Sequence, residues 1–134
     1  MRSPFSRGMN LRSIFDRSEA PEPDELDGAY RFEFLTFPIP WFGRLQWRKR
    51  FDGIRGVGYN EIRDKLTFGH FQLRGEGGAG NGALRLDYQA AGSGLPFSAI
   101  DSEVRRVERG AYLGRLGLRV LGRTVGLGWF ALWR

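Results

Sequence analysis

The stretch LQWRKRF, residues 45–51, alternates apolar and polar side chains with the period of a β-strand. One face of such a strand carries Leu45, Trp47, Lys49 and Phe51, and the other carries Gln46, Arg48 and Arg50. The lysine on an otherwise apolar face has two interpretations. It either points into a dry interior, or lies near the end of the strand and extends its ammonium group to water. The second is favoured because most lysines stay partly hydrated.

The same alternation recurs along most of the chain. Further strand-like segments are residues 26–34, 59–63, 65–74, 83–89, 111–120 and 124–134, with glycine- and proline-rich turns between several of them. Residues 97–110 are ambiguous, because Ile100, Val104 and Val107 fit a helix while the β-branched content also suits a strand. About eight short strands predict an all-β fold, either a sandwich or an antiparallel up-and-down β-barrel. The barrel is favoured because closure leaves no strand edge unpaired.

Residues 1–25 form a separate N-terminal arm in this interpretation. Asn10 is placed to cap a short helix that carries Leu11, Ile14 and Phe15 on one face. The acidic run EAPEPDE, residues 19–25, is predicted to be a linker, and residues 26–134 are predicted to form a single barrel domain. The arm is either mobile or a helix that closes one end of the domain.

Composition limits the functional classes. The chain has 134 residues, a net charge of +6 and no cysteine, which fits a cytoplasmic protein without disulfides. The only lysines are Lys49 and Lys65, and the many arginines are spread along the chain, which argues against a nucleic-acid-binding surface. No run approaches the roughly 18 apolar residues of a membrane helix, so no membrane span is expected.

Candidate site residues come from the faces of the predicted strands. His70, in FGHFQ, shares a strand face with Leu66 and Phe68. One histidine without cysteine argues against a zinc site, although a haem ligand remains open, and no cofactor is expected. Asp101 or Glu61 could be the acidic partner of Lys49 if that lysine points inward. The residues expected to line a ligand site are Tyr30, Phe32, Phe34, Trp47, Lys49, Phe68, His70, Tyr88, Asp101, Arg105 and Trp129.

Two pairs of fragments carry a resemblance to known families. LDGAYR (26–31) followed by WRKRFDG (47–53) resembles the pattern of the GXWXG family, with Tyr30 in place of its tryptophan and Phe32 in place of its second glycine. LDYQAAGSGLPFSAID (86–101) followed by EVRRVERGAYLG (103–114) resembles the companion domain of unknown function. The matching positions there are Tyr88, Pro96, Ile100, Asp101, Val104, Arg105, Val107 and Gly114. The strand order also resembles lipocalin-like (calycin-type) barrels. These resemblances imply a cupped barrel for a small apolar or amphipathic molecule, and they imply no reaction.

Three functions follow as hypotheses. The first is a barrel that binds a small apolar or amphipathic ligand, entered past FPIPWFG (37–43), with Lys49 or Arg105 holding a carboxylate. The second is a small isomerase or decarboxylase of a hydrophobic acid, which needs a tyrosine, Lys49 and a carboxylate such as Asp101 to converge. The third is binding of nucleic acid or an anionic surface through arginine and aromatic side chains.

Overall fold

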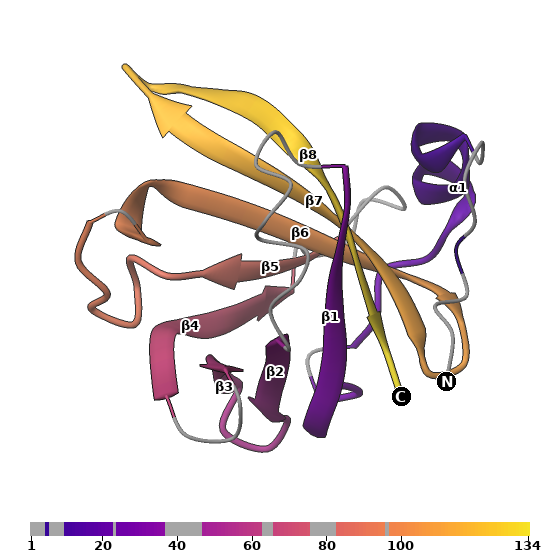
Figure 1. The fold of residues 1–134 in the computed structure, drawn as a ribbon, viewed down its shortest axis with the longest axis horizontal. Coiled ribbons are helices and arrows are strands. Elements are labelled where there is room, and N and C mark those ends of the chain that lie inside the picture. Colours follow the sequence, from indigo (N-terminus) through magenta and orange to yellow (C-terminus); the bar gives the residue numbers. More distant parts are fainter. Residues whose placement is uncertain are drawn as a thin grey trace.

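Eight antiparallel strands close into a barrel in which each strand pairs with its neighbours in sequence and the last pairs with the first (Figure 1). The computed structural model describes residues 5, 10–22, 24–36, 47–62, 66–75, 83–95 and 97–134. The strands are β1 (Gly28–Thr36), β2 (Trp47–Asp52), β3 (Val57–Ile62), β4 (Leu66–Gly75), β5 (Leu84–Asp87), β6 (Ile100–Glu108), β7 (Ala111–Val120) and β8 (Arg123–Trp133). A short helix, α1 (Leu11–Arg17), precedes them. The predicted eight-stranded up-and-down barrel with a short N-terminal helix is confirmed.

Strand β2 keeps the alternation read from LQWRKRF. Lys49 and Phe51 are buried in the barrel, while Arg48 is exposed. Lys49 pairs with Tyr30 of β1 on one side and Asn60 of β3 on the other. Since directly paired residues of neighbouring strands lie on the same face of a sheet, Lys49 and its two partners all point inward. The interpretation that Lys49 reaches water is therefore wrong, because its side chain is only 3% exposed.

A β-bulge in β4 reverses the face on which His70 lies. The pairing of β3 with β4 shifts register between Gly58 and Asn60, and Gly69 has a φ of +57°. That left-handed conformation is natural for glycine and lets one extra residue enter the strand. Phe68 before the bulge and Phe71 after it consequently both contact the interior, and His70 is turned to the outside. Its predicted place beside Phe68 on one face is wrong for this reason.

The ambiguous segment 97–110 is a strand. A 3-10 turn, Phe97–Ala99, leads into β6, in which Ser102 and Val104 are buried and Val107 is partly exposed. The spacing of four between Ile100 and Val104 fits both a helix and every second residue of a strand. The apolar pattern does not distinguish a helix from a strand here, because Val107 is the only one of the three apolar residues that departs from the strand period.

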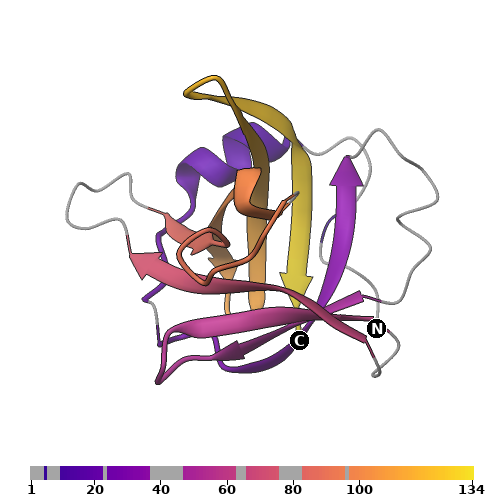
Figure 2. The ribbon, with the colours of Figure 1, turned by 90° about the vertical axis from the view of Figure 1, so that its left-hand side faces the viewer.

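Helix α1 lies against the outer wall of the barrel (Figures 1 and 2). Its first turn is capped by Asn10, whose side chain accepts a hydrogen bond from the Ser13 N–H at 3.1 Å. Phe15 is buried against Trp129, with ring centroids 5.4 Å apart, and its carbonyl accepts a hydrogen bond from the Arg105 guanidinium at 2.8 Å. The structure therefore places Arg105 and Trp129 beneath the helix and not in the barrel interior, contrary to the prediction for both. No helix among the described residues is long and apolar enough to span a membrane.

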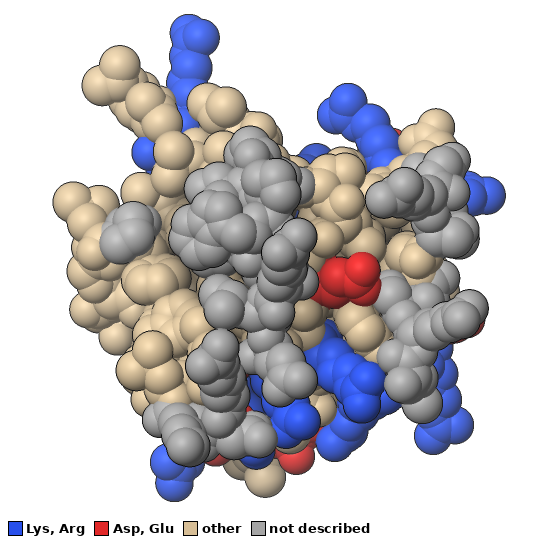
Figure 3. All heavy atoms as spheres, viewed as in Figure 1, with Lys and Arg blue, Asp and Glu red and all other residues tan. Residues whose placement is uncertain are grey.

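Ion pairs between neighbouring strands lie on the outer surface. Arg50 of β2 donates to Glu61 of β3 at 3.0 Å, and Arg85 of β5 donates to Asp101 of β6 at 2.8 Å. Asp101 and Glu61, the two candidate partners for Lys49, are thus on the opposite side of the wall from that lysine. Figure 3 shows Lys and Arg side chains at several separate places on one face, with acidic side chains among them.

Candidate ligand-binding site

One end of the barrel interior holds a cavity of about 430 Å³. The described residues that line it are Phe32, Phe34, Trp47, Lys49, Asn60, Ile62, Leu66, Phe68, Tyr88, Phe97, Ile100, Ser102, Leu116, Leu127 and Phe130. Leu66 at its edge is 60% exposed, so the cavity reaches the protein surface. The volume falls within the roughly 300–1,000 Å³ common for small-molecule sites. The predicted entrance, FPIPWFG, lies outside the described residues.

The other half of the interior is filled with side chains. Tyr30 packs edge-on against Phe51 and Tyr112, and Phe51 packs against Phe71. These residues are at most 5% exposed, and none of them lines the cavity. Tyr30, which the sequence placed in the site, therefore belongs to the packed half of the barrel. The filled half gives the cavity a closed inner end.

Aromatic side chains from several strands form much of the cavity wall. Phe32 of β1 stacks on Phe130 of β8 at 5.0 Å, and it also contacts Trp47 of β2 at 5.3 Å. Trp47 in turn packs against Phe68 of β4 at 5.0 Å. The Phe130 ring covers Gly114, where an added Cβ would lie 2.0 Å from the ring. Only glycine at position 114 lets Phe130 occupy this place in the wall.

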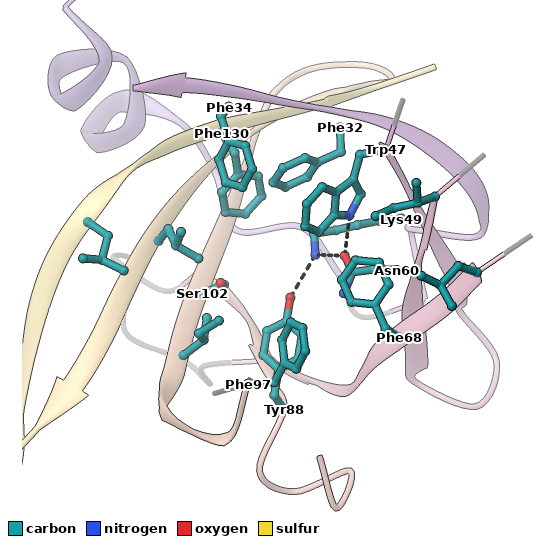
Figure 4. Close-up of a pocket in the computed structure, with 15 residues that line it drawn as sticks. Phe32, Phe34, Trp47, Lys49, Asn60, Phe68, Tyr88, Phe97, Ser102 and Phe130 are labelled. Carbon is teal, nitrogen blue, oxygen red and sulfur yellow. Dashed lines mark hydrogen bonds between the residues drawn. The ribbon is translucent and has the colours of Figure 1, made fainter. Parts of the chain in front are cut away.

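Lys49 extends into the inner end of the cavity, where its amine hydrogen-bonds to two side chains (Figure 4). Its Nζ donates to Asn60 Oδ1 at 2.5 Å and to the Tyr88 hydroxyl oxygen at 2.9 Å. The Asn60 oxygen also accepts from Trp47 Nε1 at 3.0 Å, and the Asn60 amide donates to the Gly69 carbonyl at 3.0 Å. Asn60 is thus held by contacts at both ends of its amide group, and it in turn positions the lysine.

The described residues of the cavity give the charge of Lys49 no acidic partner. No carboxylate is among the described lining residues, and the Nζ instead lies over the rings of Phe32 at 5.0 Å and Phe71 at 5.2 Å. Burial lowers the pKa of Lys49 from its ordinary 10.5 to about 7, because the ammonium form loses its hydration. Burial also raises the pKa of Tyr88, which keeps that hydroxyl protonated at neutral pH. Both forms of the lysine are accessible near pH 7.

Ser102 adds a second polar group to the wall. It is 1% exposed, and it lies near enough to Tyr88 to act on the pKa of that hydroxyl, although its Oγ makes no hydrogen bond of standard geometry among the described residues. Figure 4 shows this oxygen on the same side of the cavity as the Tyr88 hydroxyl. A buried hydroxyl without a partner is costly, since it has given up its bonds to water. A ligand head group near Lys49 would meet this hydroxyl as well.

Six of the eleven predicted residues line the cavity: Phe32, Phe34, Trp47, Lys49, Phe68 and Tyr88. The other five do not. His70 is exposed on the outer face with its ring 5.6 Å from that of Tyr59, so the cavity holds no imidazole for a haem. Asp101 is outside as well, so the predicted convergence of Lys49 with that carboxylate is absent. No group of three or more potential metal-ligating side chains occurs in the described part of the chain.

Sequence reasoning missed Asn60, which accepts a hydrogen bond from the lysine, and Ser102, a buried polar residue of the same cavity wall. Asn60 could have been found from the β2–β3 hairpin, because a short turn at 53–56 pairs it with Lys49. Ser102 could have been found only by treating residues 100–104 as a strand, which places it between Ile100 and Val104 on the inner face. Both signals depend on pairing and not on residue type.

Comparisons with known proteins show a shared fold and identify no activity. No family model matches the chain, and no curated protein matches it. One solved structure, the crystal structure of a protein from Thermomonospora curvata, superposes with a TM-score of 0.66 over 97% of this chain and 88% of that one, at 20% sequence identity. At that identity the similarity shows the fold alone. The chain therefore shares its fold with this solved protein.

Proposed function

We propose that the barrel binds a small amphipathic molecule, with its apolar body in the cavity and a carboxylate head group at Lys49. The observation that carries this proposal is the position of one buried cation at the closed end of a largely apolar cavity. An apolar body would displace water from aromatic walls, which favours binding in proportion to the area buried. The lipocalin-like resemblance of the sequence agrees with such a ligand.

The polar groups at the inner end favour an anionic head group. The lysine lacks a carboxylate partner in the described part of the cavity. A ligand carboxylate would supply the missing negative charge and would favour the ammonium form of Lys49. The Ser102 and Tyr88 hydroxyls can donate hydrogen bonds to the same head group. Charge-assisted hydrogen bonds of this kind are about twice as strong as neutral ones. Three donors around one position support binding of an acid over an alcohol of equal length.

Displacement of a neutral fluorescent probe tests the proposal. Aminoanthracene would be bound first, and decanoic acid and decanol would then compete for the cavity. We expect decanoic acid to displace the probe at about a tenfold lower concentration than decanol, which corresponds to about 1.4 kcal/mol.

Two variants, each lacking one cation, distinguish an effect of the cavity cation from a general effect of surface charge. Lys49→Met should still bind aminoanthracene but lose the preference for the acid. Arg55→Met removes a cation from an exposed turn outside the cavity and should behave as the wild type. Failure of the probe to bind, or an acid preference that survives Lys49→Met, would overturn the proposal.

A further inference from the structure

We propose that Lys49 is a nucleophilic amine that captures apolar aldehydes as a Schiff base inside the barrel. This inference rests on the proposed function only in requiring that an apolar molecule can enter the cavity. It goes beyond that function because it assigns a covalent reaction to the site. The ligand class is an aldehyde with an apolar body, not an acid.

The surroundings of the amine are those that a reactive lysine requires. Lys49 lines the cavity, so a guest can reach its Nζ, and the described wall there has no carboxylate to hold the amine as an ammonium ion. The two groups that contact the Nζ are neutral: the Asn60 amide oxygen at 2.5 Å and the Tyr88 hydroxyl at 2.9 Å. A lysine desolvated in an apolar pocket is one of the established ways to activate this side chain.

The protonation state of Lys49 also supports the proposed reaction. With a pKa of about 7, about half of the amine is neutral at pH 7. A hydrated lysine at its ordinary pKa of 10.5 is neutral in roughly one molecule in 3,000 at this pH. Only the neutral form has a free electron pair with which to attack a carbonyl carbon. Burial thus supplies the reactive form without any neighbouring base.

The reaction is balanced without an oxidant or a reductant. The Nζ electron pair forms a bond to the aldehyde carbon, and the carbonyl π electrons move to its oxygen. The Tyr88 and Ser102 hydroxyls can donate hydrogen bonds to that oxygen as it becomes negative. The oxygen takes the two protons that the amine nitrogen loses, and it leaves as water while the C=N bond forms. The aromatic walls would limit the access of water that reverses this step.

The sequence makes the reaction unusually easy to locate, because Lys49 and Lys65 are the only lysines in the chain. The full chain would be incubated at pH 7 with decanal and sodium cyanoborohydride, which reduces the imine to a stable amine. Each modified amine adds the mass of decanal less one oxygen atom. Peptide mapping then assigns the label to position 49, to position 65 or to the N-terminal amine.

We expect wild type and Lys65→Arg to be labelled at Lys49, and Lys49→Arg to lose that label while keeping its positive charge. Labelling at Lys49 should be at least about tenfold faster in the folded protein than in the urea-unfolded chain. Its rate in the wild type should rise with pH and level off above about pH 7. The pH profile needs no variant, so it holds even where Lys49→Arg fails to fold. Equal rates in folded and unfolded protein, or a rate that keeps rising to pH 10, would overturn the inference.

The outcomes separate this inference from the proposed function. Decanoic acid should slow the labelling by decanal, because both molecules occupy one cavity. Displacement of aminoanthracene by decanoic acid without faster labelling of Lys49 would overturn the Schiff base alone. Loss of both would overturn the cavity as a binding site.

Discussion

Lys49 and Asn60 face each other across strands β2 and β3, and the lysine Nζ donates to the asparagine Oδ1 at 2.5 Å. The asparagine oxygen also accepts from the Trp47 indole at 3.0 Å. A single amide therefore satisfies two buried donors, one from a cation and one from an aromatic ring. The polar part of the candidate site is built on this side chain.

Replacement of Asn60 by alanine should destabilise the protein by about 1–3 kcal/mol. The substitution leaves the Trp47 and Lys49 donors without their shared acceptor, and an unsatisfied buried polar group costs free energy of this size. The free energy of unfolding in urea measures the effect. Gln72→Ala, at a half-buried position on the same sheet, is the matched control and should cost less. Equal losses in the two variants would contradict this role for Asn60.

Replacement of Lys49 by methionine should stabilise the protein below pH 7. The pKa of Lys49 is about 7 in the folded chain and near 10.5 when unfolded, so the unfolded chain holds more protons between these values. The contribution of Lys49 to the unfolding free energy therefore rises with pH from about 7 to 10.5, and its penalty is fully present below pH 7.

A methionine avoids burying the charge, and we expect a gain of about 1–4 kcal/mol at pH 6 that shrinks toward pH 9. Denaturant unfolding of both proteins at several pH values provides the measurement. A gain that grows with pH would show that burial does not lower the pKa of Lys49.

The affinity for decanoic acid should be constant from pH 6 to about 7 and then fall by up to about tenfold per pH unit. Below pH 7 the lysine already carries the charge that pairs with the carboxylate. Above pH 7 binding must take up a proton, and the cost grows with pH until the pKa of the complex is reached. Displacement of aminoanthracene across this range measures it, with decanol as the control whose affinity should change little. An acid affinity that is flat to pH 9 would exclude Lys49 as the anchor.

Replacement of Gly69 by alanine should destabilise the barrel more than replacement of Gly92. Both glycines have a positive φ, +57° and +80°, which costs an alanine about 1–2 kcal/mol. A Cβ at Gly69 would also lie 2.7 Å from the Asn60 amide nitrogen, whereas one at Gly92 meets nothing within 4 Å. Thermal or urea unfolding of both variants isolates the cost of that contact. A Gly69→Ala loss no larger than that of Gly92→Ala would show that the contact relaxes freely.

Alternation in the sequence was enough to predict the number and direction of the strands. In β2 and β5 the period of two is uninterrupted, so the alternation correctly predicts the inward face that carries Lys49 and Leu86. In β4 the alternation breaks at Gly69, where one extra residue reverses the face of the residues that follow it. In β8 both faces are apolar, because helix α1 covers Trp129 from outside, so alternation does not distinguish the inward face there.

Local sequence patterns predict an all-β fold with a barrel as the favoured form, a helix capped by Asn10, and an apolar strand face interrupted by Lys49. These are local properties, because backbone geometry ties them to residues a few positions apart. Long-range contacts instead set which groups bind the lysine amine, Asn60 and Tyr88, and they place Arg105 and Asp101 outside the barrel. Those placements depend on strand register and on the bulge at Gly69, which arise from contacts between residues distant in the chain.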